Sequence, residues 1–260
     1  MAKELSRPTK RVINIVIKLS FAGILTALCV VFMKFLPIQL PAILPTARVS
    51  LGPAIIIFAS IFLGPFWGMA VGALADFFGF VFDTTGFPYA PGITVLYALL
   101  GFSSYFVFKF FKNIKNKGDL TAIFVFSVAL VLVMATIQVF RMDTVTLNLK
   151  DIEFNLTAKL TILGIVYTLT AFMLAVVFVY KHIQEKRNKS DGALVMQIAL
   201  TSIVLEVFVI MLFGAFVKSL HFGMNFNVVV FTQLIILFIN VPINIAIVTI
   251  LKKLSSKILL

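Results

Sequence analysis

Asp76 is the residue of this sequence best placed for chemistry, because it is a carboxylate inside an apolar stretch. It follows Gly64, Gly68 and Gly72 at intervals of four residues. On a helix this spacing predicts a stripe without side chains, against which a neighbouring helix can pack almost backbone to backbone. An ionisable group beside such a stripe is a candidate for binding a ligand or an ion. The alternative interpretation is that Asp76 is a hydrogen-bonded structural acid that fixes the pair of helices.

Four further polar residues lie within apolar stretches nearer the C-terminus, namely Glu206, Gln233, Asn240 and Asn244. Asn240 and Asn244 are one helical turn apart and flank Pro242, whose missing N–H leaves a backbone carbonyl free for other partners. Their side-chain amides have two possible roles. They could bind a ligand, or they could join neighbouring helices by hydrogen bonds.

The connection Leu36–Arg48 contains three prolines at intervals of four residues. This spacing prevents a regular helix and predicts a stiff, extended segment that covers the outer face of the protein. Arg48 ends the segment where the next apolar stretch begins. Its guanidinium could bind an anion above an outward-facing cavity, or it could anchor the chain at the membrane surface.

A second connection, Asp83–Pro91, carries the aromatic side chains of Phe87 and Tyr89 and no basic residue. Tyr97 follows about two helical turns later. These rings could stack on a flat ligand or enclose it. The alternative is that they belong to the belt of aromatic residues common at membrane interfaces.

Enzymatic chemistry is not indicated, because the sequence contains no Walker loop and no HExxH, GxSxG or CxxC motif. The single Cys29 lies within an apolar stretch. His182 and His221 have no partners at the spacing of metal ligands. We therefore expect a protein without catalytic activity, without a cofactor and without a bound metal.

The composition, with 61% hydrophobic and 12% charged residues, identifies an integral membrane protein. A membrane-spanning helix needs about 20 mainly apolar residues. The sequence therefore predicts an all-α, multi-pass helical bundle. Six spans are clear: Val12–Phe35, Pro91–Phe111, Leu120–Phe140, Leu156–Tyr180, Ala193–Val217 and Val228–Leu251.

The segment Leu51–Val81 is either one overlong helix or two short helices that are broken at Gly64-Pro65. Basic residues favour the cytoplasmic side of a membrane. Four basic clusters share that side only if the segment crosses twice, and they are found in residues 3–11, 109–117, 181–189 and 252–257. We therefore predict about eight crossings of the cell membrane with both termini in the cytoplasm. The net charge of +12 fits this bias and contact with anionic lipid, and does not indicate a nucleic-acid partner.

Three stretches together resemble the substrate-binding S components of energy-coupling factor (ECF) vitamin transporters, and most of all the folate group. They are RVSLGPAI, FLGPFWGMAVGALADFFGF and GFPYAPGITVLYALLG, which occupy residues 48–55, 62–80 and 86–101. The resemblance covers about residues 22–111 and, more weakly, residues 193–251. It rests on the glycine-rich helix, the Ala-Asp pair and the Pro-Gly-Ile-Thr turn in this order.

The resemblance implies a six-helix membrane subunit that captures a vitamin from outside and docks on a transmembrane T subunit driven by two ATPase subunits. It also implies that small residues on the first helix, here Gly23 and Ala27, contact that partner. Two features depart from the family pattern. The hairpin Leu120–Tyr180 is additional, and Gln233 stands where a folate-type member would carry an arginine.

We thus expect one integral membrane domain, residues 1–260, in which a helical hairpin (120–181) is inserted between the first four helices of the core (1–119) and the last two (192–260). The expected ligand is folate, with riboflavin, pantothenate or another vitamin as the alternative. Alternatives of a different class are a self-sufficient secondary transporter, with ion sites at Asp76 and Glu206, and a membrane enzyme. The expected substrate-binding residues are Arg48, Asp76, Phe87, Tyr89, Tyr97, Gln233 and Asn240.

Overall fold

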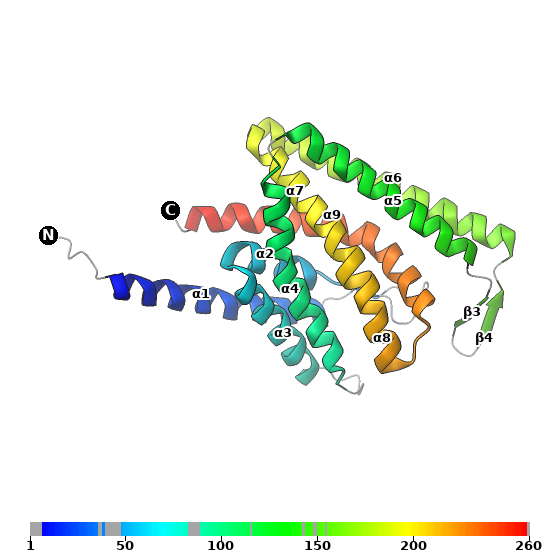
Figure 1. Ribbon diagram of the computed structural model, residues 1–260, viewed down its shortest axis with the longest axis horizontal. Helices are drawn as coiled ribbons and strands as arrows, with labels where there is room; N and C mark the ends of the chain where they lie inside the picture. The colour runs from blue at the N-terminus through cyan, green and yellow to red at the C-terminus, as the bar shows by residue number, and fades with distance from the viewer. Residues whose placement is uncertain are drawn as a thin grey trace.

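The computed structural model of the chain describes residues 7–35, 38–39, 48–82, 89–114, 116–141, 144–147, 150–153 and 155–258. Within these ranges the protein is a bundle of helices with two short ribbons of two antiparallel strands each (Figure 1). Six helical segments are long and apolar enough to cross a membrane, and two shorter apolar helices accompany them. The predicted fold class, an all-α multi-pass membrane bundle, is confirmed.

In chain order the helices and strands are α1 (Arg7–Val30), the π-helical η1 (Val31–Phe35), β1 (Ile38–Gln39), β2 (Arg48–Val49), α2 (Gly52–Leu63), α3 (Pro65–Val81), α4 (Pro91–Lys112), α5 (Lys117–Arg141), β3 (Thr144–Leu147), β4 (Lys150–Glu153), α6 (Leu156–Arg187), α7 (Lys189–Leu205), the π-helical η2 (Glu206–Phe213), α8 (Gly214–Phe222) and α9 (Phe226–Ile258).

The break predicted at Gly64-Pro65 is present. Gly64 has a φ of 111°, a conformation that favours glycine, and it separates α2 from α3. Ser60 and Gly68 meet across the break, since a Cβ atom added to Gly68 would lie 2.7 Å from the Cα atom of Ser60. In one continuous helix these positions would be about 12 Å apart. The chain therefore turns back on itself, as a double crossing requires.

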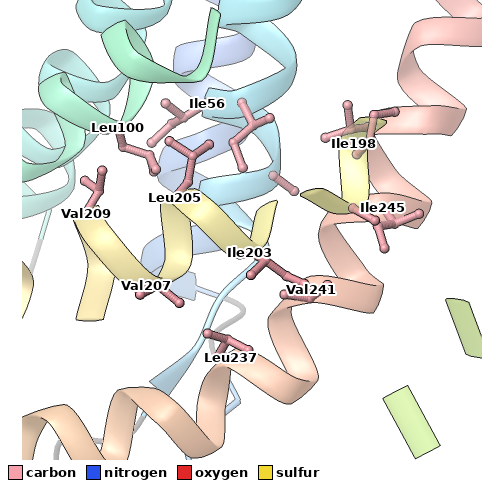
Figure 2. Packing of buried hydrophobic residues seen from close by; sticks show 14 of the residues in the cluster. Ile56, Leu100, Ile198, Ile203, Leu205, Val207, Val209, Leu237, Val241 and Ile245 are labelled. Carbon is pink, nitrogen blue, oxygen red and sulfur yellow. The ribbon is translucent and has the colours of Figure 1, made fainter. Parts of the chain in front are cut away.

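The centre of the bundle is formed by α7, η2 and α9, whose spans are buried over most of their length. One side of the α7–η2 segment packs against the first half of the chain, where Leu205 lies near Ile56 of α2 and Leu100 of α4 (Figure 2). On the side that faces α9, Ile203 lies near Val241 (Figure 2). The α7–η2–α8 segment is thus held between α4 and α9.

The helical hairpin expected at residues 120–181 is formed by α5 and α6, which contact α7 and α9. Met173 and Val177 of α6 belong to the main hydrophobic core. Near the other end of the hairpin, Gln138 Nε2 donates a hydrogen bond of 3.2 Å to Asn227 Oδ1 at the start of α9. The β3–β4 ribbon extends from this same end (Figure 1). The hairpin is therefore packed along the bundle and connected to it by a polar contact.

The end of α9 packs near the start of α7. In Figure 1 the start of α1 and the end of α9 lie at the left, the α6–α7 connection lies at the top, and the α8–α9 connection lies at the lower right. Lys253 Nζ of α9 forms an ion pair of 2.6 Å with Asp191 of α7. This ion pair connects the basic C-terminal part of α9 to the start of α7.

Candidate functional site

The glycine stripe of α3 packs directly on α4. A Cβ atom added to Gly68 would lie 2.9 Å from the carbonyl oxygen of Gly101, and one added to Gly72 would lie 2.8 Å from the carbonyl carbon of Tyr97. Only glycine allows two helix backbones to approach this closely. The predicted packing of a neighbouring helix against this stripe is confirmed.

Asp76 lies one turn beyond the stripe and is 8% exposed. It accepts a hydrogen bond of 2.6 Å from Thr94 Oγ1 of α4, and the same hydroxyl is 2.6 Å from the hydroxyl oxygen of Tyr89. Lys34 of η1 is close enough to interact electrostatically with the carboxylate. The structure thus places Asp76 at the centre of a polar network that joins η1, α3 and α4.

Tyr89 is held at the outer end of this network. Its ring centroid is 4.9 Å from that of Phe80 and 6.2 Å from that of Phe77, both on α3. Tyr97 is partly buried against the main core. The predicted Phe87 lies outside the described residues. Of the aromatic residues expected at the site, the structure therefore describes Tyr89 and Tyr97, both associated with α4.

The connection that follows α1 ends on α9. Its β2 strand pairs with β1, with Arg48 opposite Gln39 in the register. Val49 is 3% exposed and packs with Ile236 of α9. Ser50 donates a hydrogen bond of 3.2 Å to the carbonyl of Phe32, which joins the same segment to η1. The backbone of Arg48 is therefore positioned beside α9, while its side chain is not among the described parts of the chain.

A second polar group lies deep between η2 and α9. Glu206, the first residue of η2, is 1% exposed and accepts a hydrogen bond of 3.2 Å from Asn244 Nδ2. The side chain of Asn240 is hydrogen-bonded to the same carboxylate. The Oδ1 atoms of both asparagines are buried and have no hydrogen-bond partner within the described part of the chain. We refer to Glu206, Asn240 and Asn244 as the buried polar cluster.

Gln233 lies on the same helix as the two asparagines and is 8% exposed. Its spacing from Asn240 and Asn244, seven and eleven residues, places the three amides on one face of α9. Gln233 and Asn244 are separated by about 16 Å along the helix axis. The polar face thus runs from the first turns of α9 to its middle.

The predicted site residues form two groups. Asp76 and Tyr89 belong to the network on α3 and the start of α4, whereas Gln233 and Asn240 belong to α9. In Figure 1 α4 lies between α3 and α8, which separates the two groups. Thr94, the residue that links Asp76 to Tyr89, was not singled out by the sequence, although it belongs to the Pro-Gly-Ile-Thr turn.

Gly23 and Ala27 occupy a different surface. Both are exposed, and both line an apolar groove of about 620 Å³ between α1 and α3. A Cβ atom added to Gly23 would meet no atom within 4 Å. The small side chains therefore leave an open surface at membrane depth and are not required for packing inside the chain.

The comparison with known proteins gives one match. The model of the family described as ECF transporter, substrate-specific component, matches residues 18–156, which is more than half of the chain. The matched region includes the glycine stripe, the network of Asp76 and the groove. No curated protein and no solved structure matches the chain.

Proposed function

This chain belongs to the family of ECF transporter substrate-specific components, and from that premise we propose that it captures a vitamin outside the cell for an ATP-driven importer. In this role it has no catalytic activity of its own. A transmembrane T subunit and two ATPase subunits supply the energy. The family match, which covers the main region of resemblance at residues 22–111, carries the proposal.

The groove between α1 and α3 supports docking of the T subunit. It is apolar, it lies at membrane depth, and the absence of side-chain bulk at Gly23 and Ala27 allows a helix of a partner to approach closely. Helix association in lipid depends on such close packing, since lipid tails are as apolar as leucine side chains. We assign this groove to the partner subunit.

The proposed ligand is folate, a flat heterocycle with an acidic tail. The β2 strand brings the backbone of Arg48 beside α9, next to the face that carries Gln233 and Asn240. In this proposal Arg48 pairs with the carboxylate of the ligand and the amides of α9 bind its ring. Tyr97 of α4 and Phe87 are proposed as aromatic contacts of the ring from the side of α4, whereas Tyr89 packs on α3 with the network of Asp76.

Asp76 has an indirect part in this proposal. The hydroxyl of Thr94 donates a hydrogen bond to its Oδ2 atom, so Asp76 positions the start of α4 through Thr94. Riboflavin and pantothenate remain the alternatives within the class.

The test is equilibrium binding of folate, riboflavin and pantothenate to the purified protein and to Arg48→Ala. We expect folate to bind best and Arg48→Ala to weaken it about 30- to 1,000-fold, as for loss of a partly buried charge pair. Arg141→Ala, which removes an exposed arginine at the end of α5, is the control. Tighter binding of another vitamin, without a response to Arg48→Ala, would contradict the folate assignment and leave the transporter class intact.

A further inference from the structure

The buried polar cluster has more acceptors than donors. Glu206 is enclosed in the protein interior, and in the described part of the chain no lysine, arginine or histidine forms an ion pair with it. Its partners are the amides of Asn240 and Asn244. Each amide that donates to the carboxylate turns its own oxygen away, and both of these oxygens lack a partner among the described residues. Buried acceptors without donors are rare in proteins and require an explanation.

The backbone of α9 adds a further hydrogen-bond acceptor close to the two asparagines. Pro242 lies inside α9 between the two asparagines and has no N–H, so the carbonyl of Phe238 lacks its usual helical donor. On the facing segment, Glu206 begins the π-helical η2. Single π-helical turns occur often at functional sites. Both helices are therefore irregular where they meet at the cluster.

A polar cluster that served only to join two helices would not need a carboxylate. Asparagine pairs can satisfy each other, since each amide carries both a donor and an acceptor. A carboxylate adds acceptors only, and its burial is costly without a donor-rich partner. The cluster is therefore suited to a ligand that presents N–H groups.

We propose that Glu206 binds the edge of a flat heterocycle that carries two adjacent N–H donors, as in the 2-amino-4-oxopyrimidine half of a pterin. The two donors of this edge are parallel and match the two oxygens of a carboxylate, as the guanidinium group of arginine does. The neighbouring 4-oxo group accepts a hydrogen bond from the amide of Asn240 or Asn244. This inference rests on the proposed function and names the part of the ligand that Glu206 recognises.

The path to the cluster follows the polar face of α9. Gln233 lies in the outer half of the helix, and Val49 of β2 packs beside it on Ile236. A ligand that displaces β2 from α9 would pass Gln233 and reach Asn240. The two residues are about 10 Å apart along the helix axis, since each helical residue adds 1.5 Å. Pro242 interrupts the hydrogen bonds within α9, and the π-helical turn at Glu206 alters those within η2, so both helices can bend at the level of the cluster.

The test uses two ring compounds that differ at one position. Pterin carries an amino group at carbon 2, whereas lumazine carries an oxygen there. Lumazine would point this oxygen at the carboxylate. We expect the unmodified protein to bind pterin about 10- to 100-fold more tightly than lumazine, as for one or two hydrogen bonds to a charged group.

Glu206→Gln tests the residue itself. Glutamine presents one acceptor and one donor, which match the N–H and the 2-oxo group of lumazine. We expect this variant to lose the preference for pterin and to favour lumazine. Glu185→Gln makes the same chemical change in a partly exposed residue near the end of α6 and should leave the preference unchanged.

The outcomes separate this inference from the proposed function. If folate binds but the unmodified protein does not distinguish pterin from lumazine, the inference is wrong and folate remains the ligand. The same conclusion follows if Glu206→Gln retains the preference for pterin. If folate, pterin and lumazine all fail to bind, the proposed vitamin is wrong and the inference fails with it. The comparison on the unmodified protein does not depend on the folding of a variant.

Discussion

Gly68 of α3 and Gly101 of α4 are in backbone contact, since a methyl group on Gly68 would lie 2.9 Å from the carbonyl oxygen of Gly101. The contact lies one turn before Gly72 and two turns before Asp76. Because α4 carries Thr94 and Tyr97, the distance between these two glycines fixes where the polar network forms. Loss of this contact should therefore affect stability and the geometry of the site together.

We predict that Gly101→Ala destabilises the protein by about 1–3 kcal/mol, as expected for overpacking in a closely packed interface. A Cβ atom at this position would lie 2.8 Å from the backbone nitrogen of Met69. The measurement is the thermal unfolding midpoint in detergent. Gly164→Ala on α6 is the matched control, because its added Cβ meets no atom within 4 Å. Equal midpoints for both variants would show that α3 and α4 are not in tight contact.

We predict that Thr94→Val destabilises the protein by about 1–2 kcal/mol and loosens Tyr89. Valine has nearly the same shape but cannot donate to Asp76, which leaves a buried carboxylate without its 2.6 Å partner. Thermal unfolding would measure the loss of stability. Tyrosine fluorescence, compared between variants with and without Tyr89, would measure the change in the mobility of its side chain. Thr161→Val is the control, since this exposed hydroxyl donates to the carbonyl of Thr157 in its own helix. An unfolding midpoint no lower than that of the control would argue against the network.

The sequence predicted the elements well, because membrane spans and glycine stripes are local patterns. The packing of α3 on a neighbour followed from glycine spacing, and the break at Gly64-Pro65 followed from the distribution of the basic clusters. The partner of Asp76 did not, since Thr94 is 18 residues away and only the folded hairpin brings it near. Glu206 was recognised as a polar residue at membrane depth, but its contact with Asn244, 38 positions later, depends on how α9 packs on η2.

We predict that Gly23→Leu or Ala27→Leu prevents assembly with the T subunit while ligand binding is retained. A leucine would fill the groove and hold a partner helix away from α1. Co-purification with the T and ATPase subunits, together with folate binding to the subunit alone, would measure the two properties. Gly164→Leu on an exposed part of α6 is the control. A variant that loses binding but still assembles would place this surface in the interior of the ligand site.

We predict that residues 116 and 225 lie on opposite sides of the membrane, with residue 116 inside. This follows from eight crossings, in which α2 and α3 each cross once. Asn116→Cys and Asn225→Cys place single thiols at exposed positions, and Cys29 is fully buried. A membrane-impermeant thiol reagent added to intact cells should label only the thiol at position 225. Labelling of both positions from outside would contradict this topology.

The central claim, that this chain binds a vitamin but depends on partners for transport, is tested most directly by uptake of radiolabelled folate into proteoliposomes. We predict that the chain alone binds folate and transports none, and that uptake requires the T subunit, both ATPase subunits and ATP. A control with an ATPase that cannot hydrolyse ATP should abolish uptake. Uptake by the chain alone, driven by a proton or sodium gradient, would contradict the account and identify a self-sufficient secondary transporter.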